Sequence, residues 1–116
     1  MKVLALIYGD EGRWDSFDDE QRKAVYTQYD AFGESAGDKI AGGAELAPTR
    51  TATTVRVRDG ETIVTDGPFA ETKEALGGFY LLECADLDEA AKLAAGIPGA
   101  ATGSIELRPV HEQDAA

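Results

Sequence analysis

The chain has few of the residues that bind polyanions, cross-link a fold or hold a metal. It contains 11 lysines and arginines against 22 aspartates and glutamates, which gives a formal net charge of −11. Because nucleic acids and anionic lipid surfaces are bound by clustered cations, we expect neither as a partner. One cysteine, Cys84, cannot form an internal disulfide, and one histidine, His111, is too few for a structural zinc site.

Long hydrophobic runs are also absent. No stretch approaches the roughly 20 apolar residues that span a bilayer. The apolar run from Val3 to Tyr8 is shorter than the hydrophobic region of a secretory signal. We therefore expect a cytoplasmic protein, and its length is that of one domain over residues 1–116.

The sequence carries no pattern of a cofactor site. The glycine pairs 42–43 and 77–78 match neither a phosphate-binding loop nor a dinucleotide fingerprint. The acidic group near residues 15–20 lacks the alternating spacing of a calcium loop and is explained by charge at a helix start. We therefore predict no cofactor and no metal.

Apolar periodicity predicts an α+β fold. Alternation and helical spacing predict elements in the order strand, helix, hairpin, strand, helix, strand, over residues 2–8, 16–37, 53–65, 78–84, 87–95 and 104–108. This order is typical of a ferredoxin-like sandwich, an antiparallel sheet with two helices on one face. Residues 40–46 remain ambiguous, because Gly42 and Gly43 weaken a strand there.

Local signals predict where the elements begin and turn. Ser16 with Asp19, and Asp86 with Glu89, have the spacing of capping boxes at helix starts. Asp59-Gly60 predicts a two-residue hairpin turn. That turn sets the register of the hairpin, and the register places three valines, Val55, Val57 and Val64, on one face, which we expect to be the interior one.

Two strands are apolar on both faces, although two helices can cover only one face of the sheet. Leu4, Leu6 and Tyr8 alternate with Val3 and Ile7 in the first of these strands. We expect a second copy to cover the remaining face in a two-fold homodimer. The alternative is that the loops at 9–15 and 37–51 cover it.

Residues 66–74 read DGPFAETKE. This string resembles the signature of the DGPFAETKE family of YCII-related proteins. The flanking segments TATTVRVRDG (51–60), LGGFYL (76–81) and IPGAATGSIELRP (97–109) look like the same family, so the resemblance covers nearly the whole chain.

The resemblance implies a ferredoxin-like unit that pairs into a dimeric α/β barrel. It also implies a small bacterial cytoplasmic protein, and an association with an extracytoplasmic-function sigma factor. Relatives in the wider YCII group carry a His–Asp pair in a cleft. Here the one histidine, His111, lies near the C-terminus rather than on the first helix, so that pair is not carried over.

Asp66 is the first candidate for a catalytic residue. In a functional interpretation it is a general base in a cleft, and four residues bind the ligand: Tyr8, Glu71, Lys73 and Tyr80. In a structural interpretation Asp66 accepts hydrogen bonds from its own turn, Gly67 and Pro68 shape that turn, and Phe69 fills the core.

Other side chains are weaker candidates. Trp14 is either a pocket aromatic or an anchor between its loop and the first helix, and the latter is favoured. Tyr26 and Tyr29 are more typical of packing than of a site. His111 is expected to be solvated and Cys84 to be buried.

Three functions remain open. The first is a homodimer that binds a small molecule, or performs acid–base catalysis, in a cleft near the DGPF loop. The second is an accessory or regulatory protein that acts with a sigma factor without catalysis, since a charge of −11 suits a basic partner. The third is a dimeric scaffold without a ligand.

Overall fold

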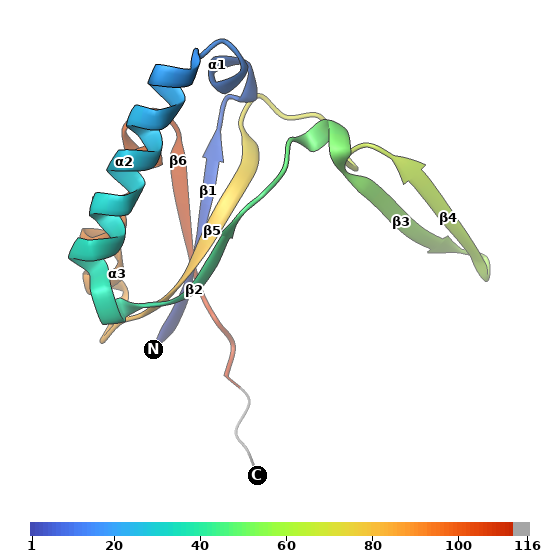
Figure 1. The fold of residues 1–116 in the computed structure, drawn as a ribbon. Helices are drawn as coiled ribbons and strands as arrows, with labels where there is room; N and C mark the ends of the chain where they lie inside the picture. The colour runs from blue at the N-terminus through green and yellow to red at the C-terminus, as the bar shows by residue number, and fades with distance from the viewer. Residues whose placement is uncertain (113–116) are drawn as a thin grey trace.

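A computed structural model describes residues 1–112 (Figure 1). The strands and α-helices follow the chain in the order β1 (Lys2–Gly9), α1 (Glu11–Asp15), α2 (Asp19–Ala36), β2 (Ile40–Glu45), β3 (Thr53–Arg58), β4 (Glu61–Asp66), β5 (Ala75–Glu83), α3 (Leu87–Ala94) and β6 (Ser104–Pro109). Three short 3-10 turns lie between them, η1 (Gly37–Lys39), η2 (Thr49–Thr51) and η3 (Pro98–Ala101).

The body of the protein is one antiparallel sheet with two helices on one face. The strand order is β2-β5-β1-β6, and every neighbouring pair is antiparallel. Helices α2 and α3 lie on the same side of this sheet (Figure 1). The predicted ferredoxin-like α+β fold is confirmed, and β2 and β6 are its edge strands.

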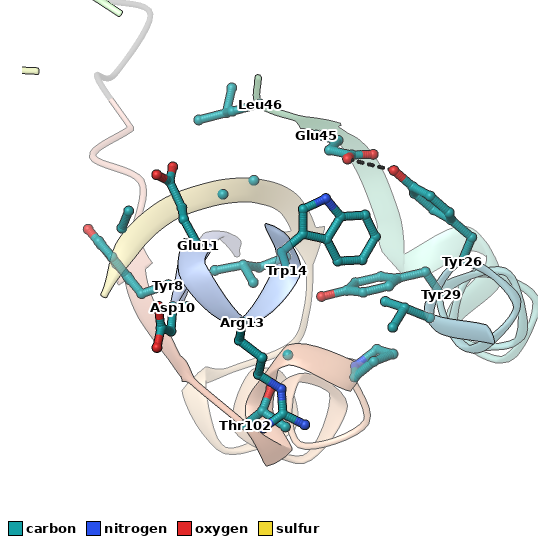
Figure 2. Close-up of a pocket in the computed structure, with 18 of the residues that line it drawn as sticks. Tyr8, Asp10, Glu11, Arg13, Trp14, Tyr26, Tyr29, Glu45, Leu46 and Thr102 are labelled. Atoms are coloured by element: carbon teal, nitrogen blue, oxygen red, sulfur yellow. Dashed lines mark hydrogen bonds between the residues drawn. The ribbon is translucent and has the colours of Figure 1, made fainter. Parts of the chain in front are cut away.

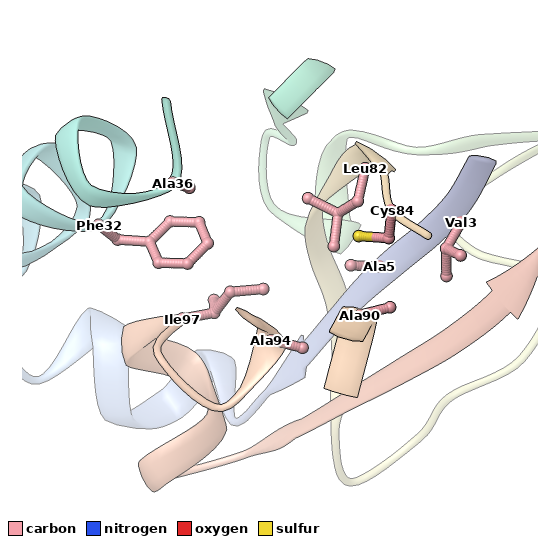
Figure 3. Packing of buried hydrophobic residues seen from close by; sticks show 9 residues of the cluster. All are labelled: Val3, Ala5, Phe32, Ala36, Leu82, Cys84, Ala90, Ala94 and Ile97. Carbon is pink, nitrogen blue, oxygen red and sulfur yellow. The ribbon is translucent and has the colours of Figure 1, made fainter. Parts of the chain in front are cut away.

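The core lies between the sheet and the two helices. Val3 and Leu82 from the central strands are fully buried, together with Ala90 of α3, while Phe32 of α2 and Ile97 pack into the same cluster (Figure 3). The buried positions on β1 alternate with half-buried Leu4 and Leu6. These two leucines therefore belong to the opposite face, which the helices do not cover.

The sheet contains β2 rather than the predicted hairpin. A strand forms at Ile40–Glu45 because its glycines allow a close approach to β5. A Cβ on Gly43 would lie 2.6 Å from the Phe79 carbonyl oxygen, and one on Gly78 would lie 2.9 Å from that of Ala44. Gly43, one of the two glycines that weakened this strand in sequence, is thus required by the pairing of β2 with β5.

The hairpin β3–β4 forms a separate two-stranded sheet, which we call the arm. Its predicted register is confirmed, with Val55 opposite Val64 and Arg58 opposite Glu61. Asp59 and Gly60 both have positive φ, 51° and 78°, as the tight Asp-Gly turn requires. The arm projects from the body on the side of the sheet opposite to α2 and α3 (Figure 1).

The interior position expected for the valine face of the arm is wrong for the single chain. Val55 and Val64 are 61% and 62% exposed, and Val57 is 59% exposed. The radius of gyration of 16.5 Å exceeds the about 13 Å of a compact chain of this length. The alternation of the arm was predicted correctly, but nothing within residues 1–112 covers its apolar face.

The first long helix starts later than predicted. Asp18, not Ser16, is its N-cap: the Gln21 amide donates to Asp18 Oδ1 at 2.8 Å, and the Asp18 amide donates to Gln21 Oε1 at 2.9 Å. Residues before it form the separate short helix α1. At α3 the predicted cap is confirmed, since the Glu89 amide donates to Asp86 Oδ1.

Candidate functional site

A cleft of about 970 Å³ opens between α1, α2 and one end of the sheet. This volume is at the upper end of the range of small-molecule sites, roughly 300–1,000 Å³. Its wall is rich in aromatic rings, which come from β1, α1 and the residues after it, α2 and β5: Tyr8, Trp14, Phe17, Tyr26, Tyr29, Phe79 and Tyr80 (Figure 2).

Helix α1 is held over the cleft by hydrogen bonds at its start. Asp10 Oδ1 accepts from the Gly12 amide at 2.9 Å, which caps the helix. The Glu11 carboxylate accepts from the Thr49 amide at 2.8 Å and from the Thr49 hydroxyl at 2.7 Å. The two bonds between Glu11 and Thr49 join α1 to η2. One edge of the cleft is therefore connected to the segment that leads into the arm.

Trp14 is the centre of the aromatic wall. Its ring meets that of Tyr26 edge to face, with centroids 5.6 Å apart. The Arg22 guanidinium lies 5.5 Å from the Trp14 ring and donates to the Trp14 carbonyl at 3.2 Å. Trp14 therefore anchors α1 to α2 and lines the cleft at once, so both interpretations of this residue hold.

Three tyrosines of the cleft, Tyr26, Tyr29 and Tyr80, have a raised pKa. The hydrogen bond that Tyr26 donates to Glu45 Oε1, 2.9 Å long, raises the pKa of Tyr26. Burial raises the pKa of Tyr29 and, in the same way, that of Tyr80. These groups offer hydroxyl donors and ring faces to a ligand rather than general bases.

The structure divides the predicted site residues into two groups. Tyr8 and Tyr80 line the cleft. Asp66, Glu71 and Lys73 do not line it; all three are exposed, at the end of β4 and in the segment that follows. Asp66 lies on the same face of the arm as Val64, and like Val64 it is exposed in the single chain.

The chain turns at Gly67 in the DGPF segment as predicted, but the other two parts of the structural interpretation are not seen. Among residues 1–112 no hydrogen bond from this turn reaches the Asp66 side chain, and Phe69 is not in the core. Gly67 has φ 95°, a left-handed conformation that favours glycine, and its amide donates to the Ala52 carbonyl at 2.7 Å. The Gly67 carbonyl accepts from the Thr54 hydroxyl at 2.8 Å. Phe69 is 80% exposed, so the prediction that it fills the core is wrong.

The side chains used most often as nucleophiles or zinc ligands do not line the cleft in the part of the chain that the structure describes. Within residues 1–112 its lining includes no serine, cysteine, lysine or histidine. Cys84 is buried in the core, where burial raises the pKa of its thiol, and His111 is exposed after β6. The same part of the chain holds no group of three or more side chains placed to bind a metal ion.

None of the helices found in residues 1–112 has both the length and the apolar character needed to cross a bilayer. The fold and the cleft together define a class, a small α+β domain with an aromatic-lined cleft beside its antiparallel sheet.

The chain belongs to the YCII-related domain family, whose model matches residues 1–114. It is similar to the uncharacterized protein R00369 of Rhizobium meliloti (strain 1021). The two are 44% identical over 119 residues, which cover 95% of this chain and 92% of the relative.

Proposed function

We propose that this protein binds a small organic molecule in the aromatic cleft. The observation that carries the proposal is the cavity of about 970 Å³ itself, whose wall combines ring faces with a few polar side chains. Such a composition is typical of ligand sites, in which apolar contact supplies affinity and polar groups fix orientation. The lack of a serine, cysteine or lysine nucleophile in the described lining favours binding over covalent catalysis.

We also propose that the protein is a homodimer in which the arm of one copy packs on the other copy. Three valines on one face of the arm are each about 60% exposed, and isolated hairpins are marginal in water. The sheet has an apolar face with half-buried Leu4, Leu6 and Leu81 that no helix covers. Pairing two copies removes both surfaces from water.

The arm gives the DGPF segment a role in this dimer. Asp66, Glu71 and Lys73 lie on or next to the arm and are exposed in their own chain. An exchanged arm carries them to the partner, where Asp66 can act as the acid–base or polar group of a shared site. If the valine face is not covered by a second copy in the purified protein, its exposure supports the second candidate function, contact with a sigma factor.

Ligand binding is tested by thermal unfolding and fluorescence against a broad metabolite panel. A ligand that binds only the folded state raises the unfolding midpoint by mass action. Trp14 is the one tryptophan of the chain and lines the cleft, so the same ligand is expected to change its emission. Tyr26→Ala, which removes part of the wall, is expected to weaken binding at least about tenfold.

Thr27→Ala is the matched control, because Thr27 is exposed on the same helix but does not line the cleft. It should bind as the wild type does. If no compound changes the midpoint or the emission of the wild type, the binding proposal is wrong and a role through protein contact is favoured.

The role of Asp66 is tested by Asp66→Ala in the same assay. We expect this variant to reduce the ligand-dependent increase of the midpoint while changing the midpoint without ligand by no more than a few degrees, because Asp66 is exposed. The opposite result, a lower midpoint with an intact ligand effect, would assign Asp66 to the turn alone.

A further inference from the structure

The charged groups that line the cleft are mostly of one sign. Four carboxylates and one guanidinium are present, from Asp10, Glu11, Asp15, Glu45 and Arg13. A concave site lined by one sign of charge concentrates ligands of the opposite sign, because its low-dielectric walls focus the field. The cleft therefore attracts cations and repels anions.

Two of these carboxylates are occupied by the protein itself. Asp10 caps α1, and both oxygens of Glu11 accept hydrogen bonds from Thr49. The guanidinium of Arg13 lies 5.6 Å from the ring of Phe17, which places it on that side of the cleft.

Glu45 is different, because it keeps an oxygen for a ligand. Among residues 1–112 it is in no ion pair, and the one side-chain hydrogen bond that it accepts, from the Tyr26 hydroxyl, uses Oε1. At the end of β2 its carboxylate accepts the hydrogen bond from the Tyr26 hydroxyl, and the ring of Tyr26 in turn meets that of Trp14 (Figure 2). A charge bound at Oε2 would thus also be close to the ring of Tyr26.

Aromatic rings next to a carboxylate are a recognised arrangement for organic ammonium groups. The negative face of a ring attracts a cation, most strongly for tryptophan and tyrosine. The indole of Trp14 already has one cation near it, the Arg22 guanidinium at 5.5 Å. Tyr29, from the next turn of α2, adds a third ring to this part of the cleft.

We propose that the ligand class of the cleft is an organic cation, an ammonium group joined to an apolar body. The ammonium is held by Glu45 and by the ring faces of Trp14 and Tyr26, and the apolar body extends along the remaining aromatic wall. This inference rests on the proposed function, since it names the ligand of the same cleft.

The test compares three compounds of nearly equal shape and different charge, which are choline, the neutral 3,3-dimethylbutan-1-ol and the anion 3,3-dimethylbutanoate. Each is titrated against the full chain with Trp14 emission as the readout. We expect choline to bind at least about tenfold tighter than the alcohol, and the anion to bind weakest. Added salt should weaken choline binding and leave the alcohol unchanged.

Glu45→Gln is expected to reduce the preference for choline over the alcohol about fivefold, because it removes the charge and keeps the shape. The matched control is Glu34→Gln, which makes the same charge change on an exposed residue outside the cleft. It should leave the preference as in the wild type, so a general effect of net charge is separated from a local one.

Equal binding of choline and the alcohol, or tighter binding of the anion, overturns the inference but leaves small-molecule binding intact. The same holds if none of the three binds and the metabolite panel identifies a ligand without a cationic group. If neither the three compounds nor the panel gives any response, the proposed function itself is wrong, and the inference falls with it.

Discussion

Val64→Asp is expected to convert a dimer into a monomer and to raise the dissociation constant at least about 100-fold. Val64 is 62% exposed at the centre of the valine face, opposite Val55. Burying a valine contributes about 1.5–3 kcal/mol, and burying an unpaired carboxylate in its place costs more. Since the arm makes few contacts with its own body, the substitution should not unfold the chain. Analytical ultracentrifugation over a range of concentrations measures the change.

Thr65→Asp is the control for this experiment. Thr65 is the next residue of β4, is also exposed, and points to the opposite face of the arm. The added charge is the same, so a dimer that survives Thr65→Asp and not Val64→Asp identifies the valine face as the contact. A wild type that sediments as a monomer would refute the homodimer and leave the valine face free for another protein.

Gly103→Ala is expected to destabilise the protein by about 3 kcal/mol or more. A Cβ at this position would lie 2.0 Å from the Tyr8 carbonyl oxygen and 3.2 Å from the Gly9 Cα. Both atoms belong to the backbone of β1, which cannot move without opening its pairing with β6 at Tyr8 and Ser104. The measurement is the urea concentration at the unfolding midpoint.

Gly33→Ala is the matched control, because the same methyl group is added where no atom lies within 4 Å. Gly33 is inside α2, and alanine there should stabilise the helix by up to about 1 kcal/mol. The two variants should thus move the midpoint in opposite directions. A midpoint for Gly103→Ala close to that of the wild type would mean that β1 and β6 do not approach as closely as described.

Predictions based on neighbouring residues agree best with the structure. The hairpin register follows from Asp59-Gly60, because a two-residue turn leaves one pairing for the strands on either side. The start of α3 follows from Asp86 and its spacing to Glu89. The start of α2 also depends on neighbouring residues, but it was predicted too early. Ser16 and Asp18 are both good N-caps, and only Asp18 has Gln21 three residues later to complete the capping box.

The cleft depends on residues whose spacing in the chain carries no signal. Trp14, Tyr26 and Glu45 come from α1, α2 and β2, and they meet only because α2 crosses the sheet beside its edge strand. Glu45 was not a candidate, since a single glutamate in the segment Gly42-Gly43-Ala44-Glu45 resembles any solvated residue. Placing Glu45 near Tyr26 requires knowing that β2 is the edge strand beside α2, and the sequence does not give that position.

Local patterns were enough to predict the α+β class, most elements and the turn at 59–60, because each depends on neighbouring residues. The tertiary structure decided that β2 and not the hairpin completes the sheet, since Gly43 and Gly78 matter through backbone atoms that are distant in the chain. It also decided that the valine face of the arm is exposed. Alternation shows that a strand has an apolar face, but the partner of that face is set by long-range packing, which a period of two residues does not encode.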